Sequence, residues 1–183
     1  MASETKFAGT GANVAGANTD WVNPDRITAE DGSSATSTFT PAPSGVSDYI
    51  KGTNFGFGIP AGATIKGVEV GFKVWDSGAA ISIFAVQTIS AKLVKGGSIS
   101  GNDKADQAFW SVTALTWKTL GSATEMWGLA LTPADCNASD FGAVVEVIGL
   151  IPGINNVATM DAMKITVYYS VSLPSSQGFI IAP

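Results

Sequence analysis

Two pairs of aspartates lie close enough in the sequence to act as a general acid and a general base. Asp103 and Asp106 form one pair, and Asp135 and Asp140 form the other. Such carboxylate pairs catalyse glycoside hydrolysis when the two groups differ in pKa. Both pairs lie among Asn, Gly and Ser residues, a context typical of solvated turns, so we expect neither pair to be catalytic.

Other groups that commonly do chemistry are scarce. The chain has no histidine, which excludes Ser-His-Asp and Cys-His catalysis, and its one cysteine, Cys136, is expected to be a buried thiol. The segment 101–106 offers oxygen ligands for calcium, but Lys104 lies at its centre and the spacing fits no defined calcium loop. The sequence therefore predicts no enzyme activity, no cofactor and no metal site.

Five tryptophans could provide flat rings for a sugar or a protein neighbour: Trp21, Trp75, Trp110, Trp117 and Trp127. Trp75 falls on the polar side of an alternating segment, so we expect it to be exposed and able to bind a partner. We expect Trp110 and Trp127 to lie in the core.

The composition is that of a chain that can bury a core but carries few charges. Of its 183 residues, 45% are hydrophobic and 14% are charged, and the net charge is −5. Scattered basic residues on an acidic chain argue against nucleic acid as a partner, and no apolar run is long enough to cross a membrane. The lone cysteine and the absence of a secretory signal pattern predict synthesis in a reducing cytoplasm.

The clearest structural pattern is the stretch 55–75, FGFGIPAGATIKGVEVGFKVW. Pro60 and Gly62 predict a tight turn before a β-strand. Every second residue of the strand is apolar and is predicted to face a core: Val68, Val70, Phe72 and Val74.

Further strand patterns predict an all-β chain: 33–40, 81–94, 126–131, 143–151 and 164–173. The only helix pattern is a short turn within 132–141, where Thr132 can cap, Pro133 fits the first position and Asp135 follows three residues after the cap. The stretch 46–59 predicts a short helical turn or an irregular link. Together these patterns predict one antiparallel β-sandwich of jelly-roll type over residues 21–173.

The two ends of the chain fall outside this pattern. We interpret residues 1–20 as an extended N-terminal arm, with a disordered terminus as the alternative. Residues 174–183 form an apolar tail, which could instead pack back onto its own sandwich. Both ends carry isolated apolar residues that we expect to bind partners: Phe7, Phe179, Ile180 and Ile181.

Four ordered motifs carry a resemblance to a known family: FGFGIPAGATIKGVEVGFKV, AKLVKGGSISGNDKA, MWGLALTPADCNASDFGAVV and MDAMKITVYY. The series, over roughly residues 48–170, resembles a β-sandwich module of structural proteins of tailed bacteriophages and prophages. Members usually have serine or valine at the position of Cys136. The resemblance implies a virion component, and such modules serve in capsid decoration and in tail or fibre parts alike.

We therefore expect a capsid decoration, or cement, protein that is made in the host cytoplasm and located on the capsid surface of the virion. Its expected partners are the major capsid protein and itself, as a homotrimer, because charge-poor surfaces and apolar tails need cover and capsids have three-fold positions. The alternative is a tail or fibre component, such as a receptor-binding knob that recognises host carbohydrate through Trp75.

Overall fold

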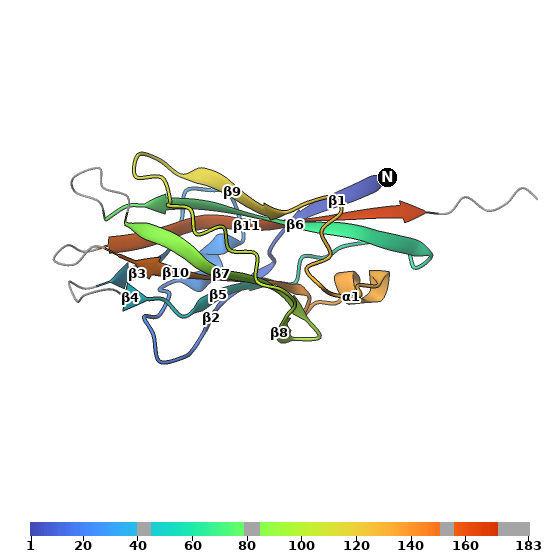
Figure 1. The fold of residues 1–183 in the computed structure, drawn as a ribbon, viewed down its shortest axis with the longest axis horizontal. Helices are drawn as coiled ribbons and strands as arrows, with labels where there is room; N and C mark the ends of the chain where they lie inside the picture. The colour runs from blue at the N-terminus through green and yellow to red at the C-terminus, as the bar shows by residue number, and fades with distance from the viewer. Residues whose placement is uncertain (40–44, 79–84, 151–155, 172–183) are drawn as a thin grey trace, which may run out of the picture.

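The computed structural model describes residues 1–39, 45–78, 85–150 and 156–171. Within these ranges two antiparallel sheets pack face to face (Figure 1), which confirms the predicted β-sandwich. Sheet A consists of β1 (Ala2–Phe7), β3 (Ala35–Phe39), β6 (Ala63–Asp76), β9 (Thr116–Gly121) and β11 (Asn156–Val171). Sheet B consists of β2 (Thr10–Val14), β4 (Gly45–Val46), β5 (Tyr49–Thr53), β7 (Val86–Lys95), β8 (Ser98–Ser100) and β10 (Gly142–Gly149).

The strand order is that of a jelly roll. In sheet A, β3 and β1 lie end to end along one side of β11, and β6 and then β9 follow on its other side. In sheet B the order is β2, β5, β10, β7 and β8. The chain crosses between the sheets at most connections, so neighbouring strands come from distant parts of the sequence, as the jelly-roll type requires.

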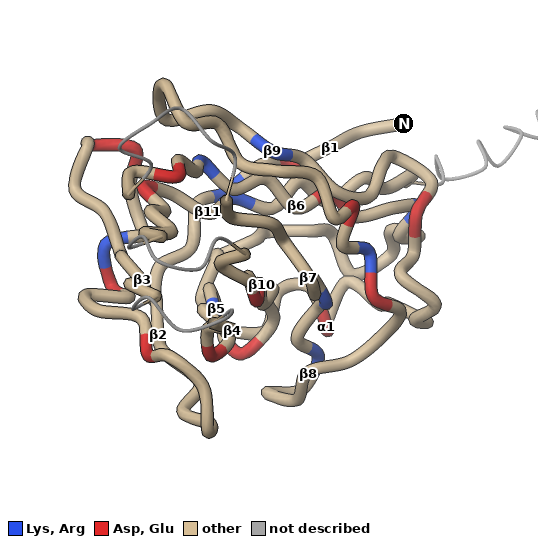
Figure 2. The backbone as a smooth tube through the Cα atoms, turned by 60° about the vertical axis from the view of Figure 1, so that its left-hand side comes forward, with Lys and Arg blue, Asp and Glu red and all other residues tan. Residues whose placement is uncertain are grey.

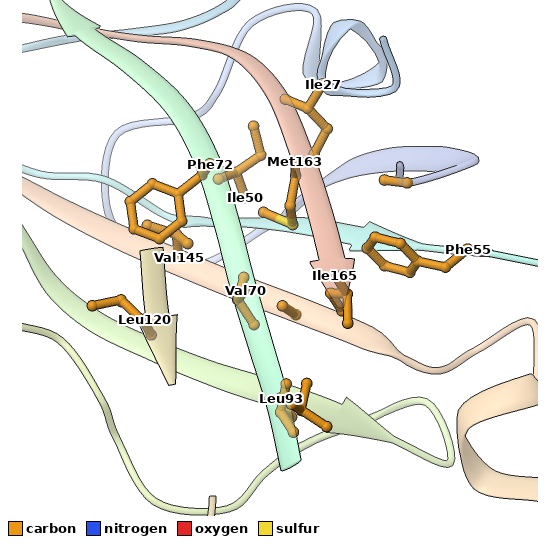
Figure 3. Close-up of a cluster of buried hydrophobic side chains, with 14 of the residues drawn as sticks. Ile27, Ile50, Phe55, Val70, Phe72, Leu93, Leu120, Val145, Met163 and Ile165 are labelled. Atoms are coloured by element: carbon orange, nitrogen blue, oxygen red, sulfur yellow. The ribbon is translucent and has the colours of Figure 1, made fainter. Parts of the chain in front are cut away.

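The core lies between the sheets and is built by alternate residues of the long strands. The four apolar residues predicted to face inward from β6 are at most 1% exposed. Figure 3 shows side chains of the two sheets meeting in this layer, among them Val70, Phe72 and Ile165 of sheet A and Leu93 and Val145 of sheet B. The period-2 pattern therefore identified the central strand correctly.

The segment 1–20, expected to be an extended arm, contributes a strand to each sheet. β1 pairs with β11 along its whole length, and β2 pairs with β5. Between them, the N–H of Ala8 donates to the carbonyl of Met163 at 2.9 Å, and that of Gly9 donates to the carbonyl of Thr53 at 2.9 Å. The predicted arm is therefore wrong for residues 2–14. Its strands were hidden because Ala8 is the only buried hydrophobic residue before Trp21.

The loop after β2 is fastened to the buried carboxylate of Asp48. This side chain accepts hydrogen bonds from the backbone N–H groups of Gly16 at 2.8 Å and Asn18 at 3.3 Å, and from the amide of Asn13 at 3.2 Å. Burial opposes the charge of Asp48, but the hydrogen bonds outweigh it and lower the pKa of the carboxyl. A charged acceptor thus holds the N-terminal residues against the sandwich.

Two local predictions were wrong. Residues 49–53 form the strand β5. The alternation pattern does not identify this strand, because its core position 52 is a glycine, which leaves room for the sulfur of Met163. Residues 126–131 form no strand. Trp127 lies there with a positive φ of 54°, fully buried, and its indole N–H donates to the carbonyl of Val68 at 2.9 Å.

The short helical elements are a 3-10 turn, η1 (Pro24–Ile27), and α1 (Pro133–Asn137). α1 confirms the predicted cap: the N–H of Asp135 donates to the Thr132 hydroxyl, and the Asp135 carboxylate accepts the N–H of Thr132 at 2.8 Å. None of the helices in the described ranges is long and apolar enough to cross a membrane.

Candidate functional site

The outer face of sheet A carries a tryptophan laid over a glycine. Gly71 of β6 has no side chain, and a Cβ placed there would lie 3.5 Å from Cε3 of Trp117 and 3.0 Å from Cε of Lys164. Trp117 comes from β9 and Lys164 from β11, the two neighbours of β6. The missing side chain of Gly71 therefore lets two residues from opposite sides meet above the central strand.

Trp117, Lys164 and Phe7 form what we call the aromatic cluster. The ammonium of Lys164 lies 3.8 Å from the centre of the Trp117 ring, which is a cation–π contact. The ring of Phe7, at the end of β1, lies 6.3 Å from that of Trp117. Phe7 is 40% exposed, so the cluster presents apolar surface together with a positive charge.

An ion-pair network borders this cluster. The ammonium of Lys73 lies 2.7 Å from the carboxylate of Glu30 and 3.3 Å from that of Asp161. The hydrogen bond from Lys73 lowers the pKa of Glu30, and the same bond raises the pKa of Lys73. Asp161 is buried and also accepts the N–H of Gly32 at 2.8 Å. The network fixes the loop after η1 beside the cluster.

The partner-binding residues predicted from the sequence are not all brought together. Phe7 lies in the aromatic cluster. Trp75 lies on the same face of sheet A but is half-buried, and its indole nitrogen is enclosed. Phe179, Ile180 and Ile181 lie outside the described residues. Trp110 and Trp127 are fully buried, as predicted.

Sequence analysis included Trp117 among five possible contact tryptophans but selected only Trp75, and it did not identify Lys164. The segment Thr116–Gly121 shows no clean alternation of polar and apolar residues, because Trp117 and Leu120 are three residues apart and lie on opposite faces of the strand. The sequence could not show that the Trp117 ring reaches over Gly71, because that depends on the pairing of β9 with β6, in which Trp117 lies opposite Lys73.

In each of the two carboxylate pairs, the two side chains have different partners and different structural roles. Asp103 accepts hydrogen bonds from the Ser90 hydroxyl and from the N–H groups of Ala91 and Ala105. Asp106 pairs with the ammonium of Lys118 at 3.0 Å. In the other pair, Asp135 caps α1 and also lies 3.2 Å from the ammonium of Lys95, whereas Asp140 is exposed.

The outer face of sheet B carries a second polar group of side chains. The Tyr49 hydroxyl donates to the Ser90 hydroxyl at 3.0 Å, and Ser90 donates to Asp103. Glu146 pairs with Ser90 across β10 and β7. Burial, and secondarily the charge of Asp103, raises the pKa of Glu146, whereas hydrogen bonds lower the pKa of Asp103 against its burial. The described residues form no pocket around these side chains.

The Cys136 thiol, in α1, is enclosed in the core. Cys136 is 2% exposed, and burial, reinforced by the charge of Asp135, raises its pKa to about 12. Such a thiol is a core residue with little thiolate character. Within the described ranges, no three His, Cys, Asp or Glu side chains are placed so that they could hold a metal ion.

Comparisons with known proteins identify no family. No family model matches the chain, and no curated protein sequence matches it. Among solved structures, one with a similar course of the chain is the family 11 carbohydrate-binding module of the cellulosomal cellulase Lic26A-Cel5E of Clostridium thermocellum. The two chains are 9% identical, with a TM-score of 0.38, over 94% of this chain and 91% of that chain.

Proposed function

We propose that this protein is a structural component of a tailed-bacteriophage virion, namely a capsid decoration protein that binds the major capsid protein and stabilises the shell. It acts by binding and has no catalytic role in this proposal. The four sequence motifs quoted above motivate the virion assignment, and the aromatic cluster on the open face of sheet A is the observation that supports a contact role.

The surface chemistry supports a protein partner. Apolar rings beside a cation, with no enclosed pocket among the described residues, suit contact with another folded surface. Figure 2 shows acidic and basic residues interspersed along the described chain. Five of the ten basic side chains lie in ion pairs with acidic neighbours: Lys6, Lys73, Lys95, Lys104 and Lys118. This arrangement disfavours nucleic acid, which needs clustered free cations.

The second candidate is a tail or fibre knob that binds host carbohydrate. Trp117 favours it, because an indole laid along a sheet face is a stacking surface for a sugar ring. Lys164 already contacts one face of that ring, however, and a sugar would have to displace the ammonium or use the other face. Trp75, the residue expected to serve this role, is half-buried like Trp117, and its indole nitrogen is enclosed.

Purified virions test the two candidates. A decoration protein should be present in hundreds of copies over the shell, and recombinant protein should bind capsids that lack it. The double variant Phe7→Ser, Trp117→Ala should lose this binding while keeping its fold, whereas Val22→Ser, an exposed apolar residue outside the cluster, should keep it. A few copies at the tail, with retention of host polysaccharide by the isolated protein, would overturn the decoration role in favour of the knob.

A further inference from the structure

β1 lies at the edge of sheet A and pairs on one side only. Its partner is β11, with Ala2 opposite Tyr169 and Phe7 opposite Lys164. Among the described residues no strand pairs with its other side. Three of its side chains lie on the exposed face: Ser3, Thr5 and Phe7. An unpaired edge of this length is a ready template for another strand.

The backbone groups at this free edge follow from the pairing with β11. Ala8 donates to Met163, its opposite residue, so hydrogen-bonded pairs alternate back along the strand from that point. Thr5 and Thr166 consequently form a non-hydrogen-bonded pair, which agrees with their hydroxyls lying 2.8 Å apart. The N–H and C=O groups of Ser3, Thr5 and Phe7 therefore point away from β11.

We propose that two copies of this chain associate through antiparallel pairing of their β1 strands, about a two-fold axis at Thr5. Thr5 then lies opposite the partner's Thr5, and Ser3 lies opposite the partner's Phe7. Two hydrogen bonds at each of these three symmetric pairs satisfy every outward backbone group of the segment. The two copies of sheet A become one continuous sheet.

The charges of β1 select this register. With Thr5 on the axis, Glu4 lies opposite the partner's Lys6, and Lys6 lies opposite the partner's Glu4. If the two-fold axis moves by one residue to Glu4, Glu4 lies opposite the partner's Glu4. If it moves by one residue to Lys6, Lys6 lies opposite the partner's Lys6. Like charges directly opposite destabilise a sheet, whereas opposite charges stabilise it. Within one copy Glu4 and Lys6 already lie 3.3 Å apart on one face, so both are placed to form the crossed pairs.

This contact goes beyond the proposed function and does not depend on a capsid role. It is isologous and produces pairs of copies. The homotrimer expected from the sequence would require a further contact elsewhere on the chain. Pairing of β1 would then link a copy in one trimer to a copy in another.

Cysteine substitutions test the register. Opposite residues of a hydrogen-bonded pair have Cα atoms about 5.5 Å apart, within disulfide range. Under mild oxidation Thr5→Cys should give a covalent dimer at least about tenfold faster than the matched variant Ser3→Cys, whose two copies lie beyond disulfide range. Ser3 and Thr5 are both exposed, and the buried Cys136 should add no background. Equal rates for the two variants, or no dimer from Thr5→Cys, would overturn the proposal.

Charge substitutions give an independent test by sedimentation over a concentration series. Glu4→Lys and Lys6→Glu should each weaken self-association about tenfold or more, because every crossed pair becomes repulsive. An equimolar mixture of the two variants should associate again, since each Lys then lies opposite a Glu of the partner. Recovery in the mixture cannot result from misfolding of either variant. Failure of the mixture to recover, or a wild-type chain that remains monomeric throughout, would contradict the pairing.

Discussion

The ammonium of Lys164 lies 3.8 Å from the centre of the Trp117 ring, directly above a position where β6 has a glycine. This contact joins the two strands that flank β6 without any hydrogen bond between them. It also places a positive charge over the half-buried ring of Trp117, next to the exposed ring of Phe7. This cluster should contribute much less to the free energy of unfolding than the buried tryptophans do.

Replacing Trp117 by alanine should lower the free energy of unfolding by about 1–2 kcal/mol, because the half-buried ring loses its cation–π contact and part of its packing. Replacing Trp127 by alanine should cost about 3–5 kcal/mol, because that side chain is fully buried and its indole bonds to Val68. Urea denaturation of the two variants measures the difference. Equal losses would mean that Trp117 is a core residue and not a contact surface.

Asp48 should make stability depend on acid. Its pKa is lowered in the folded chain, so its contribution is fully present above about pH 4, the ordinary range of an aspartate, and is lost as the pH falls through the lower folded value. Asp48→Asn should therefore cost about 1–2 kcal/mol at pH 7, as expected for hydrogen bonds to a charged acceptor. The difference from wild type should shrink towards pH 2.5.

The matched control for Asp48 is Asp25→Asn, which removes the same charge from an exposed position. It should change the free energy of unfolding by less than about 0.5 kcal/mol at either pH. A loss in Asp48→Asn that is constant with pH would show that shape, and not the ionised carboxylate, holds the loop after β2.

Cys136 should be inert in the native protein. Burial raises its pKa to about 12, so the thiolate that reacts with alkylating reagents is nearly absent at pH 8. Iodoacetamide should label the chain only after unfolding, and the labelling rate should follow the concentration of denaturant. Rapid labelling of the folded protein would mean that α1 opens readily and that the thiol is accessible.

Gly11 tests whether the N-terminal residues belong to the sandwich. A Cβ at this position would lie 1.9 Å from the carbonyl oxygen of Pro24 and 2.9 Å from Cγ1 of Ile27. Gly11→Ala should thus cost at least about 2 kcal/mol, since the clash involves backbone that cannot move away easily. Gly58→Ala, where nothing lies within 4 Å, should be nearly neutral. Indifference to Gly11→Ala would restore the interpretation of residues 1–20 as a free arm.

The candidate site was only partly predictable. Phe7 was identified because an isolated apolar residue in a polar segment needs a neighbour, and the structure supplies Trp117 as that neighbour. Trp75 was selected by parity, which gives the face of a strand but not how deeply its neighbours enclose a side chain. Cys136 and the capping pair Thr132 and Asp135 were correct, because their behaviour depends on residues next to them in the chain.

Taken alone, the sequence determined those features that arise within a few residues: the alternation of β6, the cap of α1 and the absence of any long helical period. These are local effects of backbone geometry and side-chain type. Only the tertiary structure decided that Ala2–Phe7 and Thr10–Val14 are strands, that Gly52 is a core position, and that Trp117 lies over Gly71. In a jelly roll most strands pair with partners far away in the sequence, so a segment with weak alternation becomes a strand only when a neighbour such as β11 or β5 satisfies its backbone.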